Sequence, residues 1–267
     1  MKRFACAGLF VYALISVYPF LWMVTGAFKT RGEILEGNLL PREPTLDTLI
    51  ATWGRLHFLD YFLNSLKVTA MTVIGVLVVY SLASYAFAVL DFPGRRVLYW
   101  FFVALLFVPG ITVLLPVMIL EKNLGLLGTH LGLVLPFVNG TAPLTVLLLT
   151  NSYGSIPREL REAARADGAG EARIFWSVYL PLAKPAHITV AVLTAVPTWN
   201  EYVLTRVSLS DRSLFTLPLG LESLISNEVP SYNEVMAASL IIVLPVIALF
   251  LFLQRYFING LVGAIKG

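Results

Sequence analysis

The sequence predicts an all-α polytopic membrane protein in which residues 1–267 form one transmembrane domain of six helices. Of its residues, 58% are apolar and only 13% are charged, and the mean hydropathy is +0.80. A soluble protein of this length needs more polar residues to cover its surface. The apolar residues form continuous runs and do not alternate with polar ones, which favours membrane-spanning helices of about 20 residues over a β-barrel.

Six apolar segments are long enough to cross a bilayer. They lie near residues 5–28, 62–90, 97–120, 131–151, 185–206 and 236–257. The first segment follows Lys2 and Arg3, as the core of a secretory signal would. However, its apolar run from Phe4 to Val24 is too long for a signal core, and no small-residue cleavage site follows. We therefore expect an uncleaved first helix.

The positions of Lys and Arg predict the orientation, because short cytoplasmic loops carry an excess of these residues. With both termini in the cytoplasm, loops 91–96 and 152–184 lie inside, and loops 29–61 and 207–235 lie outside. The basic residues then placed inside are Lys2, Arg3, Arg95, Arg96, Arg158, Arg161, Arg165, Arg173, Lys184, Arg255 and Lys266. The outside holds more acidic than basic residues.

The long inner loop, residues 152–184, predicts two short helices. The first consists of good helix formers and stops at Gly168 in a left-handed conformation. The second is amphipathic, runs from about 170 to 179 and is ended by Pro181. Pro185 then opens the fifth span.

The first short helix carries an apolar stripe of Leu160, Ala163 and Ala164, at spacings of three and four residues. A charged stripe carries Arg158, Glu162 and Arg165. A small apolar ridge bordered by charges suits a groove in a partner protein. It equally suits an amphipathic helix that lies on lipid headgroups. Composition alone leaves both interpretations open.

In this loop, Glu162-Ala163-Ala164 is followed after three residues by Gly168, and after nine more by Val178-Tyr179-Leu180-Pro181. This spacing resembles the Glu-Ala-Ala loop of binding-protein-dependent ABC importer permeases, which have Ile where this chain has Val178. Asp167-Gly168-Ala169, Leu180-Pro181-Leu182, Trp199-Asn200-Glu201 and the ending Gln254-Arg255-Tyr256-Phe257, with Gly260 to Gly267, further resemble the carbohydrate branch, the maltose-type permeases. The likeness covers nearly the whole chain and points to the smaller of two permeases.

The resemblance implies the type I ABC importer permease fold, in which the helix around Glu162 is a coupling helix seated in a cleft of an ATPase subunit. The implied ATPase-coupling residues are Glu162, Ala163, Ala164, Asp167, Gly168, Leu180, Pro181 and Lys266. Glu162 would pair with a basic group, Gly168 would allow the turn, and Lys266 would belong to a tail that reaches toward the ATPase pair. The implied partners are a second permease, an ATPase dimer, an extracytoplasmic solute-binding protein and the bilayer, with no nucleic acid.

Polar residues within the spans predict a path for a polar solute. The candidate residues are Asn139, Thr198, Trp199, Asn200 and Glu201. Such groups in lipid often face a cavity, and an aromatic ring, an amide and a carboxylate together suit a sugar. The alternatives are hydrogen bonds between helices and, for residues 199–201, an interfacial belt.

Several kinds of site are not expected. Cys6 is the sole cysteine, and His57, His130 and His187 have no partner at metal-ligand spacing. No glycine-rich phosphate loop occurs, so ATP and Mg²⁺ are expected on the partner ATPase and no cofactor on this chain. A membrane enzyme for lipid substrates would need acids, histidines or a nucleophile clustered at one face, and a secondary transporter would show inverted repeats. Neither pattern is found.

The sequence therefore predicts a non-catalytic permease subunit of an ATP-driven importer in the cell inner membrane. By resemblance, its cargo is a sugar or oligosaccharide. A glycerol-phosphate-like polyol is the alternative cargo, and a membrane-embedded enzyme is the less favoured alternative function.

Overall fold

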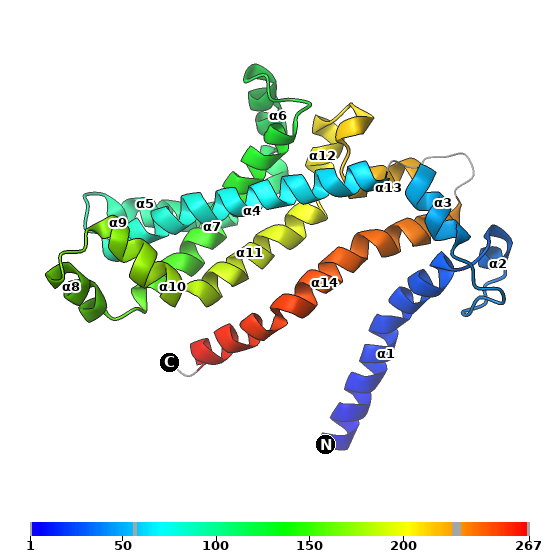
Figure 1. Ribbon diagram of the computed structural model, residues 1–267, viewed down its shortest axis with the longest axis horizontal. Helices are drawn as coiled ribbons and strands as arrows, with labels where there is room; N and C mark the ends of the chain where they lie inside the picture. Colours follow the sequence, from blue (N-terminus) through cyan, green and yellow to red (C-terminus); the bar gives the residue numbers. More distant parts are fainter. Residues whose placement is uncertain (1, 56–57, 226–230, 266–267) are drawn as a thin grey trace. The chain divides into compact units, whose positions relative to one another are not determined.

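A computed structural model describes residues 2–55, 58–225 and 231–265, in which every regular element is a helix and no strand occurs (Figure 1). The α-helices are α1 (Lys2–Ala27), α2 (Arg31–Leu35), α3 (Asp47–Arg55), α4 (Phe58–Val89), α5 (Arg95–Ala104), α6 (Leu114–Asn123), α7 (His130–Gly154), α8 (Arg158–Ala166), α9 (Glu171–Ile174), α10 (Leu180–Leu182), α11 (Lys184–Trp199), α12 (Val203–Ser208), α13 (Leu217–Ile225) and α14 (Tyr232–Ile265). Short 3₁₀ segments are η1 (Leu105–Phe107), η2 (Gly110–Val113) and η4 (Arg212–Leu214), and η3 (Phe175–Tyr179) is a π-helical turn.

Three helices are each long and apolar enough to cross a membrane, namely α1 over Gly8–Ala27, α4 and α7. Two further pairs meet this criterion only together. They are Arg95–Phe107 with Gly110–Asn123, bent by 99°, and Glu171–Leu182 with Lys184–Trp199, bent by 77°. The start of α14 is a shorter apolar helix. Each predicted span thus falls on apolar helix within the described residues, but two of them are divided between the helices of a bent pair.

Two predicted spans are interrupted in the structure. The span at 97–120 breaks after Phe107, because Pro109 has no N–H to donate and the residue before it, Val108, is extended, with φ −85° and ψ 113°. The span at 185–206 ends early, at Trp199. There the carboxylate of Glu201 accepts a hydrogen bond from the N–H of Leu204 at 3.0 Å and so begins a separate helix, α12.

The second helix of the inner loop continues beyond its predicted end. It passes from α9 through the π-helical turn η3 into α10 and ends at Leu182, so the prediction that Pro181 ends it is wrong. Pro181 lies in the first turn of α10, where a missing N–H is tolerated. The π-helical turn directs Phe175 and Tyr179 into the protein core.

Contacts divide the chain into two compact units. The first comprises Met1–Asn64 and Ser213–Leu249. In this unit α1 packs on α14 through a small cluster of buried apolar side chains. Beyond α1, the buried Lys29 uses its carbonyl to accept hydrogen bonds from Thr48 at 3.2 Å and Asn233 at 3.5 Å. These bonds fix the segment that follows α1 to α3 and α14.

The second unit comprises Ser65–Arg212 and Phe250–Gly267. In it, α7 packs against α5, α11 and α12, and α8 to α10 lie at the end of this bundle where α4 ends (Figure 1). The buried ring of Tyr85 on α4 lies edge-on to Tyr153, Phe175 and Tyr179, with centroid distances of 6.2, 5.2 and 5.0 Å. Such aromatic pairs contribute about 0.5–1.5 kcal/mol each beyond burial. They join α4, α7 and the inner-loop helices into one packed end.

Candidate functional site

The first candidate site is the loop hairpin, which we define as residues 158–182. Gly168 turns the chain at its tip with φ +82°, a conformation that glycine adopts without strain. The N–H of Gly168 donates to the carbonyl of Arg165 at 2.9 Å, and the N–H of Ala169 donates to that of Ala164 at 2.9 Å. Both bonds satisfy carbonyls in the last turn of α8. The predicted left-handed stop at Gly168 is confirmed.

Helix α8 presents most of its surface outward. Ala164 is half-buried and packs on the cluster around Tyr153, whereas Leu160, Glu162 and Ala163 are exposed. The predicted stripe of Leu160, Ala163 and Ala164 is therefore divided, because consecutive helix residues point about 100° apart and only Ala164 faces the bundle. The outward surface combines an apolar ridge with the carboxylate of Glu162.

Glu171 connects the loop hairpin to α4. Its carboxylate accepts hydrogen bonds from the hydroxyl of Tyr85 at 2.6 Å, from Arg161 at 2.8 Å and from Arg165 at 3.0 Å. Partial burial opposes ionisation of Glu171, but these donors outweigh it and hold the pKa of the carboxyl below its usual value. Sequence reasoning missed Glu171 because Tyr85 lies 86 residues earlier in the chain, and no local spacing connects them.

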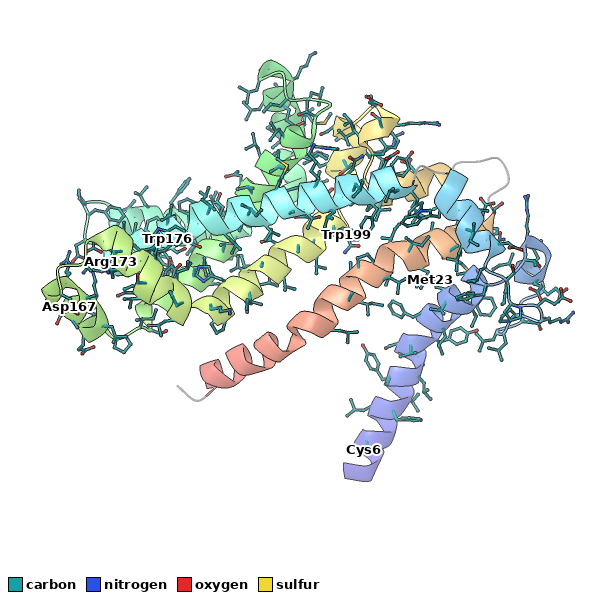
Figure 2. All side chains as sticks on the ribbon, viewed as in Figure 1. Cys6, Met23, Asp167, Arg173, Trp176 and Trp199 are labelled. Carbon is teal, nitrogen blue, oxygen red and sulfur yellow. The ribbon has the colours of Figure 1, made fainter. Side chains whose placement is uncertain are left out.

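The other predicted coupling residues lie at different depths. Asp167 is exposed at the tip of the loop hairpin, as Figure 2 shows. Leu180 is half-buried and Pro181 is exposed. Lys266 lies outside the described residues. The structure thus brings the Glu-Ala-Ala segment, Asp167 and Gly168 together on one hairpin.

The second candidate site is a cavity of about 440 Å³ in the second unit, next to the two breaks in the helices. Its lining residues are Gly110, Ile111, Val113, Leu114, Val117, Pro136, Phe137, Asn139, Gly140, Thr141, Pro197, Thr198, Glu201, Val203 and Leu204. Three of the predicted path residues, Asn139, Thr198 and Glu201, are among them. A mostly apolar wall with a few polar groups is the usual composition of a small-molecule site.

The two carboxylate oxygens of Glu201 have different surroundings. Oε1 accepts from the N–H of Leu204, and Oε2 is buried without a hydrogen-bond partner. Thr198 donates its hydroxyl to the carbonyl of Thr194 at 2.8 Å. A buried acceptor without a hydrogen-bond partner costs free energy, and a donor that reached it would recover that cost.

The remaining two predicted path residues do not line this cavity. Trp199 is buried, and Asn200 donates its amide to the carbonyl of Val196 on its own helix at 2.9 Å. Trp199 lies at the opposite end of α11 from the loop hairpin (Figure 2). Among the described residues, no group of three or more His, Cys, Asp and Glu side chains is placed to hold a metal ion.

Comparisons with known proteins all place the chain in the same family. Residues 80–262 match the family described as "Binding-protein-dependent transport system inner membrane component". The chain is 32% identical over 260 residues to the galactooligosaccharides transport system permease protein GanQ of Bacillus subtilis (strain 168), with 96% of this chain and 92% of that protein covered. It is 33% identical over 262 residues to the arabinooligosaccharides transport system permease protein AraQ of the same strain, with 96% and 92% covered.

A solved structure shares the fold. One chain of the crystal structure of a bacterial ABC transporter involved in the import of the acidic polysaccharide alginate superposes with a TM-score of 0.85. The two chains are 26% identical, and 96% of each is covered.

Proposed function

Since the chain belongs to the family of binding-protein-dependent transport system inner membrane components, we propose that it is a permease subunit of an ABC importer for a sugar or oligosaccharide. It is a multi-pass protein of the inner membrane. Its partners are an ATPase dimer, which holds ATP and Mg²⁺, and a solute-binding protein outside the membrane. A second permease completes the path, and both termini of this chain face the cytoplasm.

The observation that carries the proposal is the outward surface of α8. An apolar ridge with an exposed carboxylate, held on a defined glycine turn, suits a cleft in an ATPase subunit. When ATP closes the ATPase dimer, the loop hairpin moves with the cleft that holds it. The helices then rotate between inward-open and outward-open arrangements as packed bodies.

A crosslink from Ala163 tests this docking. With Cys6 replaced by serine, an Ala163→Cys variant that carries a short photocrosslinker is expected to form an adduct of the mass of the ATPase subunit, because Ala163 is exposed on α8. The adduct is identified by mass spectrometry in membranes that take up solute. Ser210→Cys is the control, since Ser210 is exposed beyond α12 and not on the loop hairpin. Absence of adducts from positions 160, 162 and 163 in active membranes would contradict the proposal.

A substitution at Glu201 tests the solute path. In Glu201→Gln, one oxygen is kept for the N–H of Leu204, but the other becomes an NH₂ donor, so the unpaired acceptor of this cavity-lining residue is lost. Loss of one hydrogen bond to a charged group costs about 1.5–3 kcal/mol, so we expect solute uptake to fall about tenfold. Retention of the ATPase subunit should not change. Uptake is measured with radiolabelled sugar.

The control for Glu201→Gln is Asp211→Asn. Asp211 is an exposed carboxylate ten residues further along the chain, and it is not among the residues that line the cavity. Equal uptake by the two variants would remove Glu201 from the solute path.

A further inference from the structure

We propose that Glu171 positions the loop hairpin relative to α4, so that a displacement of α8 is passed directly to that helix. The inference rests on the proposed function, because it concerns how ATPase closure reaches the spans. Glu171 makes this connection with both carboxylate oxygens: Oε2 accepts from Tyr85, and Oε1 accepts from Arg161 and Arg165. It is a positioning residue, since it acts through the groups it holds.

The side of the bridge on α8 has few other attachments. From residue 158 to 168, only Arg161 and Ala164 are half-buried, and the other residues are exposed. Arg161 directs its Nη2 and Nε to different oxygens of Glu171, at 2.8 and 3.4 Å. Such a two-pronged contact fixes the direction of the guanidinium as well as its distance. Without Glu171, α8 would be held by the packing of Ala164 and by the turn at Gly168.

The side of the bridge on α4 is rigid. The ring of Tyr85 is 4% exposed and is surrounded by the aromatic side chains described above, so its hydroxyl has little freedom to move. Its hydrogen bond to a carboxylate is short, at 2.6 Å, as expected when the acceptor is charged. The side chain of Glu171 is only 33% exposed, so this bridge is screened less than an ion pair on the surface. Glu171 therefore joins α8, which has few other contacts with the bundle, to a fixed point on α4.

The test compares Glu171→Gln and Tyr85→Phe in the complete transporter, purified with its ATPase subunits and reconstituted in liposomes. We expect the number of solute molecules taken up per ATP hydrolysed to fall at least fivefold in Glu171→Gln, with the ATPase subunits retained. Tyr85→Phe removes only the hydroxyl and should lower this ratio at least twofold. The combined variant should be no worse than Glu171→Gln, because both changes break the same bridge.

A spin label supplies a readout of position. With Cys6 replaced by serine, a nitroxide at Ala166→Cys should become more mobile in Glu171→Gln. It should not respond to Asp91→Asn, which breaks the exposed 2.9 Å ion pair with Arg95 in the neighbouring turn and is the matched control.

An unchanged ratio of solute to ATP in both single variants would overturn the proposal. Loss of the ATPase subunits or of folded chain in Glu171→Gln would also overturn it, since Glu171 would then maintain the structure and not its coupling. Failure of the proposed function is a separate result, because the unmodified chain itself would neither retain ATPase subunits nor support uptake.

Discussion

Replacement of Gly168 by proline is expected to cause a large loss of solute uptake. Proline requires φ near −65°, whereas Gly168 has φ +82°, and its ring removes the N–H that donates to Arg165. It also disfavours the conformation of the preceding Asp167, which has φ −76° and ψ 5°. Together these effects cost about 3 kcal/mol or more. The turn between α8 and α9 therefore cannot keep its conformation. We expect uptake to fall more than tenfold, measured with radiolabelled sugar in whole cells.

A pair of alanine variants isolates the turn itself. A Cβ at either Gly168 or Gly170 meets no atom within 4 Å, but Gly170 has φ −72°, which any residue adopts. Gly168→Ala should therefore lower uptake through a strain of about 1–2 kcal/mol, and Gly170→Ala should not. Normal uptake by Gly168→Pro would show that the turn at residue 168 is not needed for coupling.

Replacement of Gly132 by alanine is expected to lower the stability of the fold. A Cβ at this position would lie 2.5 Å from the carbonyl oxygen of Leu126, a backbone atom that cannot rotate away. The clash also disturbs the start of α7, where the hydroxyl of Thr129 accepts from the N–H of Gly132 at 3.1 Å. Overpacking of this kind costs about 1–3 kcal/mol. The melting temperature of the purified chain in detergent should fall by several degrees.

Gly140→Ala is the control for this variant. Gly140 lies in the same helix, α7, and a Cβ there meets no atom within 4 Å. Alanine also has the better helix propensity, so the melting temperature should be unchanged or higher. If Gly132→Ala had the same melting temperature as Gly140→Ala, the close approach of Leu126 to α7 would be refuted.

Much of the fold could be predicted from the sequence, because the bilayer imposes a length of apolar run that single segments satisfy on their own. The turn at Gly168 was also predictable, because the left-handed residue that ends a helix is determined by the local sequence. The break after Phe107 carried a signal in Pro109, but proline is common in membrane helices and does not reveal by itself which of them bend.

The candidate sites were less predictable where they depend on contacts between distant segments. Glu171 has ordinary neighbours in the sequence, and its role follows only from the approach of Tyr85 in space. Likewise, residues 198–201 are adjacent in the sequence, but the end of α11 separates them, so that Thr198 and Glu201 line the cavity and Trp199 and Asn200 do not. The direction of a side chain at the end of a helix depends on where the helix ends and how it is capped. The spacing of residues in the sequence does not determine this.

The break after Trp199 has a mechanical consequence. A continuous helix resists bending because every turn is held by hydrogen bonds along its axis, whereas the backbone between α11 and α12 carries no helical ladder through Glu201 and Tyr202. The tilt of α12 relative to α11 is therefore set by its packing on α7 and by the hydrogen bond from Ser208 to Glu121 at 3.1 Å. A change in these contacts would reorient α12 without bending α11.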